Sequence, residues 1–122
     1  MTEGNSGKMS IKLSVIKTGE HVISDIMEVV SEEGKVCGYK LKDPHVVKLN
    51  TNLMLVEQEI GRKVETNEHE VEVSLTPWIV LSEDRDVVVT LDSVIAIVNP
   101  VTSLSNLYKE KLNLNNLEVI SD

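Results

Sequence analysis

The sequence contains no phenylalanine, one tryptophan and two tyrosines among its 122 residues. Aromatic side chains therefore cannot build a core, and valine, isoleucine and leucine must supply it. Because valine and isoleucine are β-branched, this composition favours short strands over helices. The length suggests one domain, and the apolar share of 41% is enough for one modest core.

Cysteine and long apolar runs are also scarce. Cys37 is the only cysteine, so no intrachain disulfide can form, and a reducing, cytoplasmic location is expected. No apolar run reaches the roughly 18 residues that a transmembrane helix needs. Residues 1–10 are small and polar, without the apolar segment of a secretory signal, and they predict a flexible N-terminal arm.

Basic residues are outnumbered: 12 lysines and arginines stand against 20 acidic residues, and the net charge is −8. This balance disfavours broad, sequence-blind phosphate binding. The charge is uneven, however, because seven lysines lie within residues 8–48 while ten acidic residues lie within residues 57–92. Either one part of the surface is basic, or these charges are simply solvated.

The stretch VVVTLDSVIAIV at residues 87–98 contains two β-branched runs joined by the polar corner TLDS. Neither run alternates apolar with polar residues, so each strand is expected to have cover on both faces. Asp92 and Ser93 can bond their own backbone in a turn. The stretch predicts two short strands at a sharp corner, as in a small closed barrel.

Three further strands are predicted upstream. Residues 11–15 alternate and should bury one face, with Lys12 and Ser14 on the other. Residues 21–30 carry apolar side chains on both faces, which predicts a bend. A hairpin loop at 31–35, with Gly34 at positive φ, leads to a strand at 36–42.

The centre of the chain is less regular. Asp43-Pro44 should interrupt the third strand, with residues 45–50 resuming as an edge strand. Residues 62–65 and 70–75 predict a hairpin arm. Trp78 is expected to be buried, and residues 79–81 to form a strand. From Thr102, a plausible N-cap, apolar residues at helical spacing predict a helix of about ten residues.

The order of these elements resembles the Sm-like ring proteins, whose fold is a small, strongly bent five-stranded barrel. The family's second motif runs isoleucine, arginine, glycine, two variable residues, valine and a later isoleucine. Val89 to Val94, with Ile97, stands in that place and matches its apolar frame. Thr90 and Leu91 replace the arginine and the glycine.

The family's first motif is matched less well. Gly19 is aligned with the glycine of the first turn, but Glu32 and Glu33 stand near the place where the family carries an aspartate and an asparagine that help to hold a base. The whole chain is also similar to small Sm-like proteins of marine cyanophages, which would place it in the cytoplasm of the host cell.

The resemblance implies a mainly β domain with a bent five-stranded barrel. It divides the chain into an arm at 1–10, a barrel at 11–100 with an inserted hairpin arm near 51–76, and a short C-terminal helix and tail at 101–122. The family's N-terminal helix is missing.

The resemblance also implies a homo-oligomeric ring, from pentamer to heptamer, in which the fourth strand of one subunit pairs with the fifth strand of the next. The two corresponding runs lack the proline or lysine that guards a solvent-exposed edge. The alternative is a monomeric barrel whose edge the C-terminal helix covers. The expected interface residues are Val87, Val88, Val89, Val94, Ile95 and Ile97.

No local pattern predicts an enzyme, a metal site or a cofactor. The three histidines are far apart, and none is paired with Cys37 at metal-ligand spacing. Glu68-His69-Glu70 is the best local cluster for a metal, and a charged turn is the simpler interpretation. Neither a phosphate-binding glycine loop nor a local catalytic triad occurs, although a triad of distant residues remains open.

Nucleic-acid binding is the function that the resemblance implies. The candidate groups in the loops that would line the pore are Lys35, Thr90, Asp92 and Ser93. A lateral patch of Lys40, Lys42 and Lys48, with Tyr39 or Trp78 for base stacking, is the second possibility. Because no arginine stands at position 90, preference for uridine is not expected. The alternative function is an oligomeric scaffold, or a phage accessory protein, that binds other proteins.

Overall fold

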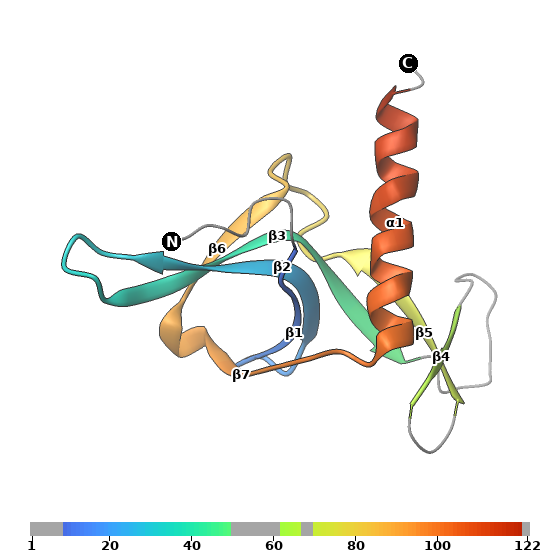
Figure 1. The fold of residues 1–122 in the computed structure, drawn as a ribbon, viewed down its shortest axis with the longest axis horizontal. Helices are drawn as coiled ribbons and strands as arrows, with labels where there is room; N and C mark the ends of the chain where they lie inside the picture. Colours follow the sequence, from blue (N-terminus) through green and yellow to red (C-terminus); the bar gives the residue numbers. More distant parts are fainter. Residues whose placement is uncertain (1–8, 50–61, 67–69, 121–122) are drawn as a thin grey trace.

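The computed structural model describes residues 9–49, 62–66 and 70–120. This part of the chain is mainly β, with one C-terminal helix (Figure 1). Most of the predicted N-terminal arm (1–8), residues 50–61 and 67–69 of the predicted hairpin arm, and residues 121–122 lie outside the described part. The elements are β1 (Ile11–Ile16), β2 (His21–Val30), β3 (Val36–Leu49), β4 (Arg62–Glu65), β5 (Glu70–Pro77), β6 (Asp86–Thr90), a 3-10 turn (Leu91–Ser93), β7 (Val94–Val98) and α1 (Thr102–Ile120).

The seven strands form one antiparallel sheet in the order β4-β5-β3-β2-β1-β7, with β6 also paired to β3. The sheet curls strongly (Figure 1), but among the described residues β6 and β7 do not pair with each other. The prediction of a closed barrel is therefore wrong for the isolated chain. The physical reason is that the short turn between β6 and β7 carries the chain from β6, which pairs with β3, to β7, which pairs with β1.

The two turns that flank β2 each place a glycine in the left-handed region, Gly19 at φ 99° and Gly34 at φ 88°, as predicted for Gly34. The predicted irregularity of β2 is confirmed, since its pairing with β3 shifts register between Ile23 and Asp25. Such a bulge bends a strand and lets it bury one face and then the other.

The interruption expected at Asp43-Pro44 is a kink, not an end. Before the kink, residues 38–42 of β3 pair with β6; after it, residues 45–49 pair with β5, on the same side. β2 pairs with β3 on the other side both before and after the kink. The prediction of an edge strand at 45–50 is therefore wrong for residues 45 and 46, which have a neighbour on each side. Residues 47–49 pair with β5 alone in the described part of the chain, and residue 50 lies outside it.

The kink is held by side chains as well as by pairing. Asp43 has φ 50°, which few non-glycine residues adopt. The Arg85 guanidinium donates to its carboxylate from Nε at 2.8 Å and from Nη2 at 3.2 Å. The Asp43 backbone N–H donates to the Arg85 carbonyl oxygen at 2.8 Å. Loop residue Arg85 thus fixes the conformation of Asp43.

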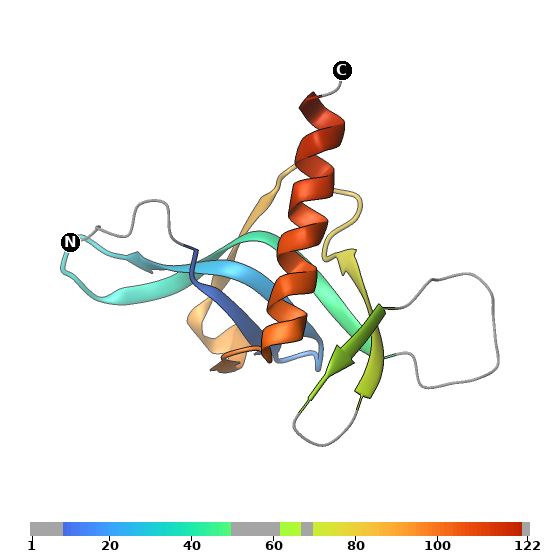
Figure 2. The ribbon, with the colours of Figure 1, turned by 45° about the vertical axis from the view of Figure 1, so that its right-hand side comes forward.

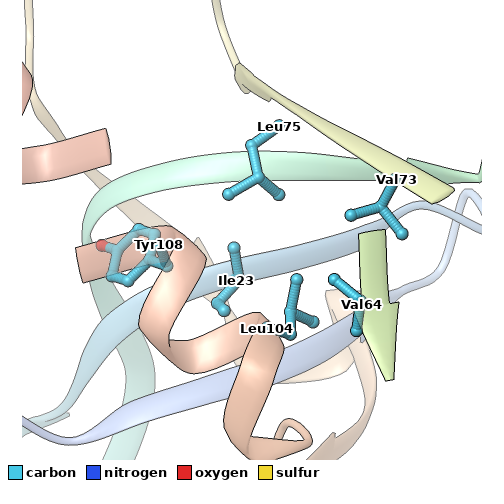
Figure 3. Close-up of a cluster of buried hydrophobic side chains, with 6 residues drawn as sticks. All are labelled: Ile23, Val64, Val73, Leu75, Leu104 and Tyr108. Carbon is cyan, nitrogen blue, oxygen red and sulfur yellow. The ribbon is translucent and has the colours of Figure 1, made fainter. Parts of the chain in front are cut away.

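Two apolar clusters cover the two faces of the sheet. The inner cluster lies within the curl and consists of Ile16, Val22, Leu41 and Val46. The outer cluster lies between the sheet, the β4–β5 hairpin and α1 (Figure 3), and consists of Ile23, Val64, Val73, Leu75, Leu104 and Tyr108. Because β1 lies between them, Ser14 is fully buried, and the prediction that it faces water is wrong.

The hairpin arm is confirmed, and it belongs to the sheet. β4 pairs with β5 in the register Arg62↔Val73 to Glu65↔Glu70, and β5 continues the sheet beyond β3. Residues 79–81 are not a strand: the Ser82 backbone N–H donates to the Ile79 carbonyl oxygen at 3.1 Å, which closes a turn. Trp78 is half-buried against the inner cluster.

The C-terminal helix is confirmed and runs for 19 residues. Thr102 is its first residue, not its cap, because the Val101 carbonyl accepts from the backbone N–H groups of Leu104 and Ser105. Figure 2 shows α1 standing across one face of the sheet, with the β4–β5 hairpin near its first turns. Leu104 and Tyr108 are buried there, and the Tyr108 hydroxyl lies 3.0 Å from the carbonyl oxygens of both Lys42 and Asp43.

His45 lies beneath this helix. Its ring meets Tyr108 edge-on, with centroids 5.8 Å apart, and its Nδ1 is 2.9 Å from the Asp43 carbonyl oxygen. Nδ1 must therefore carry the hydrogen, and Nε2 is buried without a hydrogen-bond partner among the described residues. Burial lowers the pKa of His45 below its ordinary 6.5; the bond to Asp43 opposes this, and Lys111 lowers the pKa further. The folded protein holds His45 neutral.

Acid should therefore destabilise the fold through His45. Below pH 6.5, the ordinary pKa, unfolded His45 binds more protons than folded His45, so the free energy of unfolding falls from about pH 7 toward the lower folded pKa. Urea unfolding at several pH values should show a shallower fall for His45→Gln than for the wild type. His21→Gln, at an exposed position, is the control. Parallel curves for wild type and His45→Gln would contradict this account of His45.

Candidate assembly edges and nucleic-acid surface

The outer edges of β6 and β7 carry no neighbouring strand in the described part of the chain. Within the described ranges, β6 pairs with β3 alone and β7 with β1 alone. Each edge is five residues long and presents unpaired backbone donors and acceptors, which is a template for pairing with another chain. Neither strand contains lysine or proline.

The predicted interface residues fall into two groups. Val89 and Val94 pack against the inner cluster and anchor the strands. Val88 and Ile95 point outward, with 65% and 64% of their surfaces exposed, and Ile97 is 37% exposed. Val87 is half-buried. The prediction that both faces of these strands are covered is thus wrong for a single chain, and the uncovered face is apolar.

The polar corner at residues 90–93 bonds largely with itself. Thr90 Oγ1 donates to Asp92 Oδ1 at 2.9 Å, and Ser93 Oγ donates to the Thr90 carbonyl oxygen at 2.7 Å. The Lys17 backbone N–H donates to the Ser93 carbonyl at 2.8 Å. The hydroxyls expected to contact nucleic acid therefore brace the turn. The predicted bond to the backbone is confirmed for Ser93, whereas Asp92 accepts from the Thr90 side chain.

Lys35 is exposed and lies on the hairpin loop between β2 and β3. The pairing of β3 with β6 sets Gly38, three residues after Lys35, opposite Thr90. Glu32 and Glu33 are exposed on the same loop. The two loops predicted to bind nucleic acid are therefore joined to paired strands, and the one lysine of the hairpin loop is accompanied by two acids.

Gly38, to which the sequence motifs assign no role, allows β3 to approach β6 closely. A Cβ atom at this position would lie 2.6 Å from the Val89 carbonyl oxygen. A glycine inside a strand pattern is the signal that indicates such a close backbone approach.

The lateral lysines do not form one continuous patch. Lys40 is half-buried, with Nζ 3.7 Å from the Asp86 carboxylate. Lys42 and Lys48 are exposed but lie on opposite sides of the kink in β3. The two proposed stacking residues, Tyr39 and Trp78, pack against the inner cluster, and Trp78 Nε1 donates to Glu20 Oε1 at 3.2 Å. Both side chains are therefore half-buried.

Metal-ligating side chains do not gather in groups of three or more within the described ranges. Residues 67–69 of the predicted charged turn lie outside those ranges, so the Glu68-His69-Glu70 hypothesis is not decided by the fold. None of the described helical segments is long and apolar enough to cross a membrane.

Two comparisons bear on the chain as a whole. Residues 9–113, which include every strand and the first part of α1, match a family of unknown function, DUF6561. No curated protein matches the sequence.

Gly38→Ala tests the close packing of β3 on β6. Because the new methyl would meet a backbone carbonyl, the two strands must separate, and we expect a loss of about 1–3 kcal/mol in the free energy of unfolding. Denaturant unfolding measures this loss. The matched control is Cys37→Ala at the exposed neighbouring position, which should change stability by less than about 0.5 kcal/mol. An unchanged Gly38→Ala protein would show that β6 is not held this tightly.

Proposed function

The chain belongs to DUF6561, a family of unknown function, and we propose that it is a homo-oligomeric, Sm-like ring that binds single-stranded nucleic acid. The observation that carries the proposal is the pair of unpaired, β-branched edges on β6 and β7. When β4 and β5 are set aside as an inserted hairpin, the remaining strand order is β6-β3-β2-β1-β7. This order supports the proposal. Without the hairpin, β6 and β7 are the fourth and fifth strands in chain order, and they form the two free edges, as the ring requires.

The two edges favour a ring over a simple dimer. β6 and β7 are different surfaces, so pairing one with the other joins copies head to tail, and a head-to-tail contact closes into a ring when its rotation permits. The strands also match in length, at five residues each. Pairing would satisfy the unpaired backbone groups and cover Val88 and Ile95, which a single chain leaves exposed.

The assembly is tested by light scattering at micromolar concentration. We expect the mass of a pentamer to heptamer, and a lower mass for Val88→Lys and Ile95→Lys, because each substitution places a charge beside a paired edge. Leu49→Lys is the matched control: Leu49 is equally apolar and 61% exposed, but it lies on β3, away from both edges. A monomeric wild type would refute the ring, and assembly that tolerates both edge substitutions would refute these edges as its seam.

Nucleic-acid binding is favoured by the pairing of Gly38 with Thr90, which joins the loop that carries Lys35 and the corner at residues 90–93 to neighbouring strands. A ring repeats each Lys35 around one axis, so a weak phosphate contact is made several times over. Glu32 and Glu33 are repeated equally, and position 90 is threonine. We therefore propose weak binding with little preference for uridine.

Binding is tested by titrating single-stranded RNA and DNA at several salt concentrations. Affinity should fall steeply with salt, since lysine–phosphate contacts release counterions. Lys35→Glu should abolish binding, whereas Lys40→Glu with Lys42→Glu should leave most of it, because Lys40 already pairs with Asp86. Loss of binding only in the double variant would move the site to the lateral surface. A wild type that fails to bind at low salt would refute the nucleic-acid function.

The second candidate function is an oligomeric scaffold that binds other proteins. It is favoured by the excess of acidic residues and by an exposed apolar segment at residues 79–81. A ring that assembles but binds neither RNA nor DNA would favour this function.

A further inference from the structure

The apolar segment Ile79–Leu81, here called the apolar tip, is the most exposed apolar stretch of the loop between β5 and β6. The exposed fractions of its three side chains are 46%, 69% and 99% in order. Leu81 is more exposed than any other large apolar side chain in the described part of the protein. In a monomer these exposed side chains bury little apolar surface and so contribute little to stability. A contiguous exposed apolar surface of this kind marks an interaction site.

The apolar tip is held in place on both sides. Before it, the Trp78 backbone N–H donates to the Pro44 carbonyl at 3.0 Å. Within it, Ser82 closes a turn onto Ile79, and Ser82 Oγ accepts from the Asp84 N–H at 2.9 Å. After it, Arg85 is bound to Asp43. Since the loop is already ordered, little conformational entropy is lost when the tip packs against a partner.

The position of the tip indicates which partner this is. The loop leads directly into β6 at Asp86, so the tip lies beside the start of the unpaired edge (Figure 1). Any strand that pairs along β6 must bring one of its own ends next to the loop.

Each end of β7 carries an exposed apolar side chain that could pack against the apolar tip of another copy. If β7 of another copy runs one way along β6, Ile95 comes near the tip; if it runs the other way, Val98 does, and these side chains are 64% and 48% exposed. A lysine lies near each end, since Lys17 bonds to the Ser93 backbone and the Lys12 ammonium bonds to Asn99. Glu83 and Asp84 follow the tip in the loop, so charge also matches in either direction.

From this geometry we infer that the apolar tip of one copy packs against an end of β7 in the next copy and extends the contact made by the strand edges. The inference rests on the proposed ring and names the part of the partner that the loop contacts. The tip then buries Leu81 at the seam, beside the backbone pairing of β6.

Disulfide cross-linking tests the contact directly. In a Cys37→Ser background, which removes the only cysteine, Leu81→Cys is combined with either Ile95→Cys or Val98→Cys. After mild oxidation, a non-reducing gel should show a ladder of linked copies for one of the two pairs. Leu81→Cys with Leu49→Cys, at an exposed position on β3, should give no such ladder. Absence of a ladder in both test pairs would overturn the inference.

A second measurement separates the tip from the strand edges. Leu81→Ser should raise the concentration at which the rings dissociate by roughly tenfold or more, because an apolar side chain is lost from the seam. Leu49→Ser should leave that concentration unchanged. If Val88→Lys disrupts assembly while Leu81→Ser has no effect, the tip inference fails and the ring stands. If the wild type is monomeric, both fail.

Discussion

The kink of β3 at Asp43 is the constraint on which the rest of the fold depends. It holds a non-glycine residue at φ 50°, and three elements stabilise it. The β5–β6 loop contributes the Arg85 guanidinium, α1 contributes the Tyr108 hydroxyl, and β3 itself contributes His45. A hydrogen bond to a charged group contributes more than a neutral one, so the contact of Arg85 with the half-buried Asp43 carboxylate is expected to be the strongest of the three.

The kink also determines which edges stay open. Because β3 turns at Asp43, one side of it accommodates two strands, β6 before the kink and β5 after it. The hairpin arm then covers the far half of β3 and leaves the outer edge of β6 unpaired. The loop that joins β5 to β6 must pass close to the kink, which is why the same Arg85 fixes the kink and braces the apolar tip.

Local patterns predicted most of the strands, the glycine turns and the corner at 90–93, since each depends on neighbouring residues. They failed where a distant partner decides the outcome. Ser14 is buried because α1 and the curl cover both faces of β1, and residues 45–49 have neighbours that no local pattern reveals. For the candidate site, the sequence predicted the edge residues, but it could not show that Lys40 pairs with Asp86 or that residues 79–81 form an exposed turn instead of a strand.

Pairing of β6 with β7 between copies is tested most directly by hydrogen–deuterium exchange of the backbone amides in residues 86–98, at protein concentrations above and below ring dissociation. Amides on the outer edges of both strands should exchange slowly in the assembled protein and faster after dilution, while amides of β3 that bond to β2 serve as the internal reference. Fast exchange of both edges at every concentration would contradict an assembly through these strands.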